Sequence, residues 1–259
     1  MAKKEKETKE TTKETRYRKK RGGVLYTIVA VILIAASVVA ACTVFFQVET
    51  VTVEGNERYT QEEILSVASV EMGANMILTP GEQIAQRIYG ELPYVDRVDV
   101  QKRFPTTLKL KITECQPVAV LTGAASAWVI DAKGKLLEEA DEAMAQEYAK
   151  VTGLELLEPK QGELAKTTPE NEKQLQNLTT FTQALAEYGM IDQVTSIDVS
   201  SRTEIVMVYD GRLTVKLLSS TDYDGKLRAL KTIVAMAGED GRGTVNMKGK
   251  DRVIWSKEG

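Results

Sequence analysis

Residues 92–119, LPYVDRVDVQKRFPTTLKLKITECQPVA, alternate apolar and polar side chains along two neighbouring segments. Within residues 98–101 valine alternates with polar residues, and within residues 108–113 leucine and isoleucine do the same. A period of two is typical of strands that bury one face and expose the other. The sequence therefore predicts two strands that turn at Phe104-Pro105 and cover a core with one face.

Upstream of these strands the sequence predicts one further strand and two short helices. Residues 47–54 are rich in β-branched valine, which favours a strand. Residues 60–63, TQEE, form a capping box, in which Thr60 and Glu63 satisfy each other's amide groups at the start of a helix. Residues 79–82, TPGE, place proline at the first position of a second helix. The order strand, helix, helix, strand, strand predicts an α+β unit with helices against a small sheet.

An uncharged segment precedes this unit. Val24–Phe46 runs for 23 residues without a charge. As a helix it would extend about 34 Å, which is enough to cross a bilayer. Residues 1–21 hold ten Lys or Arg and four Asp or Glu, whereas the rest of the chain is acidic. Because positive charge stays on the cytoplasmic side, we expect a single-pass type II protein with its N-terminus inside and residues 47–259 outside. Residues 1–15 have few apolar side chains and are predicted to be disordered.

A cleaved lipoprotein signal is the alternative to a retained anchor. Val39–Cys42, VAAC, resembles a lipobox, in which the cysteine is lipidated after cleavage in front of it. However, the basic region is long for a signal peptide, and Thr43–Phe46 continues the apolar run beyond the cleavage point. The sequence therefore favours an uncleaved anchor that contacts lipid through residues 24–46.

The remaining residues, 118–259, predict a second domain that is rich in strands. Residues 128–130 and 136–137 flank a turn and predict a hairpin. Apolar residues at helical spacing predict helices that begin near Thr168 and Asp222. Further strands are predicted at residues 197–199, 205–209, 213–217, 244–247 and 252–256.

Five motifs of the chain resemble, in their order, the POTRA domain of FtsQ/DivIB-type bacterial cell-division proteins. They are VTVEGN (51–56), TQEEI (60–64), LPYVDRVDV (92–100), RFPTTLKLKITE (103–114) and PVA (117–119). The resemblance implies an α+β fold: a transmembrane helix, a βααββ POTRA domain, and a mixed β-rich domain with flanking helices. The expected parts are a disordered basic cytoplasmic tail (1–23), a signal anchor (24–46), the POTRA domain (47–117) and the C-terminal domain (118–259).

The same resemblance implies a function. The implied protein is a non-enzymatic component of the divisome at the septum. It binds FtsB/DivIC-like and FtsL-like partners and other divisome components, and it helps control septal peptidoglycan synthesis. In the family the docking edge lies near the C-terminus. The matching residues here are Arg252, Val253, Ile254, Trp255 and Ser256. One of Ile254 and Trp255 must face outward, because neighbours on a strand face opposite sides, so Trp255 is either a partner anchor or a core residue. The alternative function is a POTRA-bearing envelope transport or chaperone component, although the chain lacks strands enough for a membrane barrel.

No residue pattern predicts an enzyme. The chain has no histidine and only two cysteines, Cys42 and Cys115, which removes Ser-His and Cys-His catalysis and most zinc sites. No serine is followed by lysine three positions later, so the nucleophile of penicillin-binding enzymes is missing. The acidic segment 138–142 has no calcium-ligand spacing and is predicted to be solvated. We expect no catalytic residue, no cofactor, no metal, no small-molecule substrate and, given the acidic external part, no nucleic-acid partner.

Overall fold

The computed structural model describes residues 4–123, 126–219, 223–249 and 254–257. The chain divides into two compact units. The first comprises the chain up to Thr52 with Val70–Gly81 and Val100–Leu110, and the second comprises Val53–Ser69, Glu82–Asp99 and the chain from Lys111 onwards. Helices and strands are mixed, as the sequence predicts for an α+β protein.

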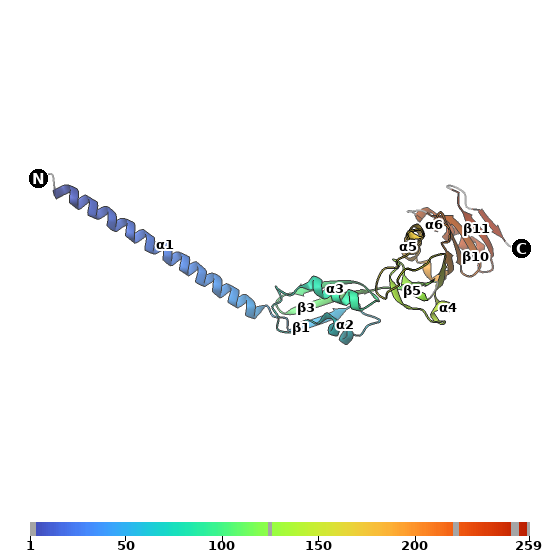
Figure 1. Cartoon of the computed structure of the whole chain (residues 1–259), viewed down its shortest axis with the longest axis horizontal. Helices are drawn as coiled ribbons and strands as arrows, with labels where there is room; N and C mark the ends of the chain where they lie inside the picture. The colour runs from blue at the N-terminus through green and yellow to red at the C-terminus, as the bar shows by residue number, and fades with distance from the viewer. Residues whose placement is uncertain (1–3, 124–125, 220–222, 250–253, 258–259) are drawn as a thin grey trace. The chain divides into compact units, whose positions relative to one another are not determined.

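The first unit begins with one continuous helix, α1 (Lys4–Phe45) (Figure 1). Its part Gly23–Phe45 is exposed, and it is long and apolar enough to cross a membrane. The prediction of disorder for residues 1–15 is wrong from Lys4 onwards, where the structure is helical. This segment is rich in Lys and Glu, which are good helix formers, and it extends an existing helix without a new nucleation step.

A small sheet follows α1 along the chain. Its order is β1-β3-β2, built from β1 (Thr50–Glu54), β2 (Val95–Arg103) and β3 (Thr107–Glu114). Two helices, α2 (Gln61–Ala68) and α3 (Gly81–Glu91), lie between β1 and β2 in the sequence. The predicted order of strand, helix, helix, strand, strand is therefore confirmed.

The predicted capping box begins α2. The Thr60 side chain accepts from the Glu63 amide at 3.2 Å, and the Glu63 carboxylate accepts from the Thr60 amide at 2.8 Å. These hydrogen bonds from Thr60 lower the pKa of Glu63. One face of the helix is then free to bury Ile64 and Ala68.

The second unit contains a nine-stranded sheet in the order β12-β11-β10-β9-β8-β7-β4-β5-β6. Its strands are β4 (Pro117–Thr122), β5 (Ala127–Asp131), β6 (Leu136–Glu139), β7 (Ala149–Thr152), β8 (Val194–Asp198), β9 (Glu204–Tyr209), β10 (Leu213–Leu218), β11 (Gly243–Met247) and β12 (Ile254–Lys257). The pairs β4/β7, β7/β8 and β10/β11 are parallel and the others are antiparallel. The sheet is therefore mixed, and β6 and β12 are its two edges.

Helices connect the parallel strands of this sheet. α4 (Met144–Glu147) precedes β7, whereas α5 (Glu172–Glu187) and the 3-10 turn η1 (Ile191–Gln193) lie between β7 and β8. α6 (Asp224–Ala237) joins β10 to β11. Buried side chains of α5 and α6 share one core with inward residues of strands from β4 to β11, so both helices cover the same sheet face.

Among the residues that the structure describes, the opposite face is buried at the β6 end of the sheet. There Val120, Val129 and Leu137 from β4, β5 and β6 pack against Tyr94 and Cys115. Side chains on both faces of β4 are consequently buried, which explains its uninterrupted apolar sequence.

Candidate functional site: a polar junction and an open sheet edge

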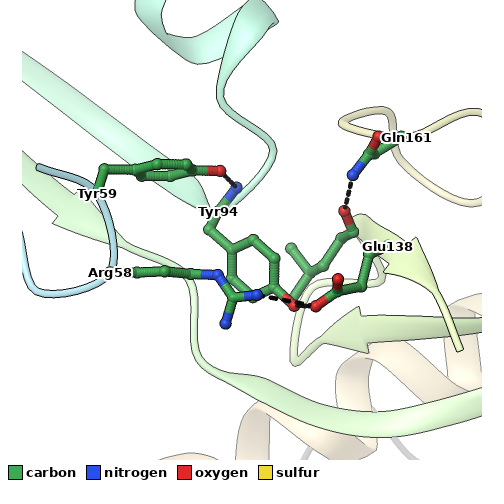
Figure 2. Close-up of polar contacts among 6 residues, drawn as sticks. Arg58, Tyr59, Tyr94, Glu138 and Gln161 are labelled. Carbon is green, nitrogen blue, oxygen red and sulfur yellow. Dashed lines mark hydrogen bonds and ion pairs between the residues drawn. The ribbon is translucent and has the colours of Figure 1, made fainter. Parts of the chain in front are cut away.

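A polar network joins Arg58 and Tyr94 to β6. Arg58 Nη2 lies 3.0 Å from Glu138 Oε1, and its guanidinium stacks 3.6 Å above the centre of the Tyr94 ring. The Tyr94 hydroxyl donates to the same carboxylate oxygen. Figure 2 shows Arg58 and Tyr94 converging on Glu138. One carboxylate thus serves a cation and a phenol together, and charge-assisted hydrogen bonds of this kind are stronger than neutral ones.

Local structure places the partners of Glu138. Arg58 and Tyr59 lie on the loop before α2, where their amides donate to the carboxylate of Glu114 at 2.9 and 3.3 Å. The Tyr94 amide donates to the Tyr59 hydroxyl at 3.2 Å, as Figure 2 shows. The loop between β1 and α2 and the loop after α3 are therefore fixed to each other as well as to β6.

A second group of charged side chains, next to the network around Glu138, surrounds the hairpin turn between β5 and β6. Lys135 is 2% exposed, and its ammonium donates to the carbonyl of Val95 at 2.7 Å and lies 3.9 Å from the centre of the Tyr89 ring. Lys133 forms an ion pair with Asp96 at 2.5 Å. Both lysines thus connect the hairpin to the region around α3 and β2.

Burial shifts the pKa values of side chains in this region. Desolvation lowers the pKa of Lys135, although the neighbouring thiol and carboxylates oppose the shift. Desolvation also raises the pKa of the Cys115 thiol to about 12, and the nearby charge of Asp131 adds to the effect. Burial, followed by the hydrogen bond to Glu138, raises the pKa of Tyr94. The thiol is consequently protonated at neutral pH and is not a nucleophile.

Asp96, Cys115 and Asp131 bring three possible ligand atoms within 4.8 Å of one another. Their surroundings suit a structural role better than a metal site. One oxygen of Asp131 accepts from the amides of Lys133 and Lys135 at 2.9 and 2.8 Å, which is the pattern of a side chain that fixes a turn. Asp96 already carries the Lys133 ion pair. The cluster therefore balances its charge with lysines of the chain itself.

Glu138 corrects the prediction that residues 138–142 are a solvated acidic segment. Its side chain is only 27% exposed and forms the centre of the junction. The sequence carries no signal for this pairing, because Arg58 is 80 residues away along the chain. Alternation along β6 could not have shown it either, because the register shifts here: Glu138 is opposite Val129, whereas Leu136 is opposite Ile130.

The opposite edge of the sheet holds the predicted docking residues. β12 pairs antiparallel with β11, with Trp255 opposite Val245 and Ile254 opposite Asn246. Trp255 is half-buried and packs against the main core, whereas Ile254 is 56% exposed and Ser256 is exposed. Arg252 and Val253 lie outside the described residues. Of the two neighbours, Ile254 is the one that faces outward.

The indole N–H of Trp255 lacks a hydrogen bond among the described residues. Its indole Nε1 is buried and has no hydrogen-bond partner within the described part of the chain. A buried donor without a partner costs stability, so Trp255 contributes here through apolar packing.

The sheet face that carries Ile254 is more open than the face under α5 and α6. The register aligns Val206, Lys216, Asn246 and Ile254 in one row across β9 to β12, and all four side chains are partly or fully exposed. The row ends at the edge strand. A molecule that bound at β12 would therefore meet the backbone groups of the edge strand and the side chains of this row together.

The fold and these surfaces define a class of protein. The chain places one apolar helix before a βααββ domain and a mixed sheet, and its polar clusters are structural. Among the described residues, the sheet edge at β12 and the face beside it are open to a neighbouring molecule.

Comparison with known proteins gives the family. The FtsQ-type POTRA domain matches residues 46–114, and the C-terminal domain of the cell division protein FtsQ/DivIB matches residues 119–248. The chain belongs to the FtsQ/DivIB family of cell-division proteins, which are not enzymes.

Individual relatives agree with this assignment. Cell division protein FtsQ of Geotalea daltonii is 32% identical over 116 residues, which cover 45% of this chain and 42% of that protein. FtsQ of Streptomyces venezuelae is 33% identical over 120 residues, covering 46% and 44%. Cell division protein DivIB of Clostridium acetobutylicum is 23% identical over 213 residues, covering 82% and 83%. The matches to the FtsQ relatives thus span less than half of their length.

Proposed function

We propose that this chain is a non-enzymatic scaffold of the division machinery at the septum. In this proposal residues 24–46 cross the membrane once, residues 1–23 lie in the cytoplasm, and a POTRA domain (47–117) and a C-terminal domain (118–259) lie outside. The external part binds FtsB/DivIC-like and FtsL-like proteins and so helps control septal peptidoglycan synthesis. Family membership and the apolar part of α1 support the proposal, and the same family membership disfavours the transport alternative.

One observation carries the binding proposal, namely the open edge at β12. Within the described residues β12 pairs with β11 alone and is the last strand of its sheet. An edge strand offers N–H and C=O groups to an added strand. Side chains next to that edge then select the partner, and in this chain Ile254 and Ser256 face outward.

The role of Trp255 follows from its packing. Because the indole packs against the main core, we propose that it orients β12 and does not itself enter a partner. Trp255→Ala should therefore weaken the fold and partner binding together, whereas Trp255→Phe should largely preserve both.

A direct test measures binding of the purified full-length protein in nanodiscs to its cognate FtsB/DivIC-like partner. Ile254→Asp places a charge at the apolar outward position of β12, and we expect a loss of affinity of about tenfold or more. Leu157→Asp is the matched control, because Leu157 is also about half exposed (50%) but belongs to the segment between β7 and α5 and not to β12. Unchanged melting temperatures would show that both variants fold. Equal affinity of Ile254→Asp and the parent protein would contradict the assignment of β12.

Localisation tests the cellular part of the proposal. A fluorescent protein fused before Met1 should give a midcell band that tightens during constriction, with the fusion intact on a blot. Uniform labelling of the envelope would contradict a role at the septum. A clipped fusion would instead show processing in front of Cys42.

A further inference from the structure

Exposed apolar side chains surround the end of the apolar helix in the first unit. Phe45 is the last residue of α1 and is 69% exposed. Ile77 and Leu78, on the loop before α3, are 49% and 78% exposed, and Phe104, in the turn between β2 and β3, is 57% exposed. These exposed apolar side chains come from three segments that are far apart in the sequence.

These segments are fixed to the end of α1. The Met76 amide donates to the Phe46 carbonyl at 2.7 Å, and the Phe46 ring meets the Phe104 ring edge-on with centroids 5.4 Å apart. The ammonium of Lys102 donates to the Ile77 carbonyl at 2.9 Å, which ties the β2–β3 turn to the loop before α3. The chain between α1 and β1 is therefore not a flexible linker at this point.

The fixed contacts determine the depth of these residues in a membrane. Phe46 comes directly after Gly23–Phe45, the part of α1 that is long and apolar enough to cross a membrane. Ile77 and Leu78 follow Met76, and consecutive Cα atoms are about 3.8 Å apart. The headgroup layer on each side of a bilayer is roughly 5–7 Å thick. If α1 spans the membrane, Leu78 and Phe104 consequently have to lie in or directly beside that layer.

The chemistry of the surface fits a lipid interface. Aromatic side chains are enriched at the level of the headgroups, and Arg and Lys extend toward lipid phosphates. Here Phe45, Phe46 and Phe104 form a continuous aromatic contact, with centroids 6.0 Å apart for Phe45 and Phe46. Arg103 is exposed next to Phe104. In water an apolar patch of this kind would be unfavourable, whereas beside a bilayer it gains contacts.

We propose that Ile77, Leu78 and Phe104 form a membrane-docking surface that rests in the outer headgroup layer and holds the first unit upright on its anchor. The occupant of the surface is the lipid bilayer. This inference rests on the proposed membrane anchor and adds a second, peripheral contact with the same membrane.

The test measures how deeply labelled positions lie in lipid. Full-length Cys42→Ala protein is placed in vesicles of phosphatidylcholine and phosphatidylglycerol, and single cysteines are introduced at Leu78 or Phe104 and labelled with bimane. The remaining cysteine of the Cys42→Ala protein, Cys115, is buried, so this protein without a new cysteine gives the background signal. Leu157→Cys and Met236→Cys are matched controls, since these side chains are 50% and 73% exposed in the second unit.

Spin-labelled headgroup lipids then quench the fluorescence. We expect labels at positions 78 and 104 to be quenched about threefold or more above those at 157 and 236, because interfacial side chains lie at headgroup depth. Quenching at 78 and 104 equal to that at the controls would overturn the docking surface. Labels at 78 and 104 that are unquenched by lipid in vesicles would also overturn it if the unlabelled cysteines at these positions are shielded from a membrane-impermeant maleimide in growing cells. That result would assign the patch to a protein neighbour.

A label inside the span separates this inference from the proposed anchor. Val31→Cys should be quenched by lipids that carry the spin label deep in the acyl chain. If it is quenched while 78 and 104 are not, the anchor is right and the docking surface is wrong. If Val31→Cys is not quenched, the proposed anchor itself fails. Circular dichroism of each labelled variant confirms that its fold is intact.

Discussion

The two edges of the nine-stranded sheet differ in how they are closed. At β6 the backbone is covered: the Leu136 amide donates to the Glu163 carbonyl at 2.9 Å, and the Leu136 carbonyl accepts from the Gly162 amide at 2.7 Å. Gln161, labelled in Figure 2, also donates to the Leu137 carbonyl at 2.9 Å. At β12 no such cover exists among the residues that the structure describes. Proteins normally protect sheet edges, so an open edge at β12, at the far end of the sheet from the protected β6, supports the binding surface proposed there.

We expect the largest effect from a substitution in the buried side chains of the closed edge, β6. Leu137 is fully buried between the sheet and Tyr94, so Leu137→Ala should lower the free energy of unfolding by about 2–5 kcal/mol. Ile254→Ala at the open edge should cost less than about 1 kcal/mol, because that side chain is exposed. Urea unfolding of the two variants measures the difference. Similar losses would show that β12 is packed as tightly as β6.

The next effect concerns the charge at the junction. Glu138→Ala removes the acceptor of the Tyr94 hydroxyl and the partner of Arg58, and we expect a loss of about 1–3 kcal/mol, most of it from Tyr94, because Arg58 is half exposed. Glu139→Ala, which changes the exposed neighbour on the same strand, should have no measurable effect. The double variant Glu138→Ala/Tyr94→Phe is the check. If its loss of unfolding free energy equals the sum of the losses of the two single variants, the hydrogen bond does not couple the two residues.

A smaller effect should follow from loosening the loop that covers β6. Gly162 has φ +83°, a conformation that other residues adopt only at a cost, so Gly162→Ala should destabilise by about 1–2 kcal/mol. Gly225 provides the control, because it lies in α6 and an added Cβ there would meet no atom within 4 Å. Gly225→Ala should be neutral or stabilising in thermal melts. Equal melting temperatures for the two variants would contradict a strained, fixed cover.

The smallest effect at neutral pH is a pH dependence confined to the closed end, which grows only above pH 9. The folded chain keeps the Cys115 thiol protonated up to a pKa of about 12, whereas the ordinary value is 9.0. The stability linked to this group is present below pH 9 and is lost as the pH rises toward 12, and Cys115→Ala should remove that loss. The pKa of Lys135 is lowered, so its effect on stability has the opposite sign: below the ordinary pKa of 10.5 the stability linked to Lys135 rises as the pH rises.

The same thiol gives a chemical measurement. In the Cys42→Ala background, alkylation of Cys115 at pH 8 should be about a hundredfold or more slower in the folded protein than in urea, because the thiolate is scarce. Equal rates would show that the junction opens readily.

Much of the fold follows from residues close together in the sequence. The strict alternation of residues 108–113 predicts a half-buried strand, and the structure buries Leu108, Leu110 and Ile112 in β3. The capping box at Thr60 and the turn between β5 and β6 are likewise local, and both are found where they are predicted. By contrast β7 has only four residues, too few for a recognisable pattern, although it lies in the middle of the sheet.

The apolar span and the order of the POTRA elements follow from the sequence alone, because each depends on residue type and local spacing. Only the tertiary structure decided which edge of the large sheet is covered, which charged side chain pairs with Arg58, and which of Ile254 and Trp255 faces outward. Alternation requires the latter two to point to opposite sides, but the side itself is set by the register with β11, where Trp255 stands opposite the buried Val245. Pairings of this kind join residues that are distant in the sequence, and their energy depends on contacts that form only in the folded chain.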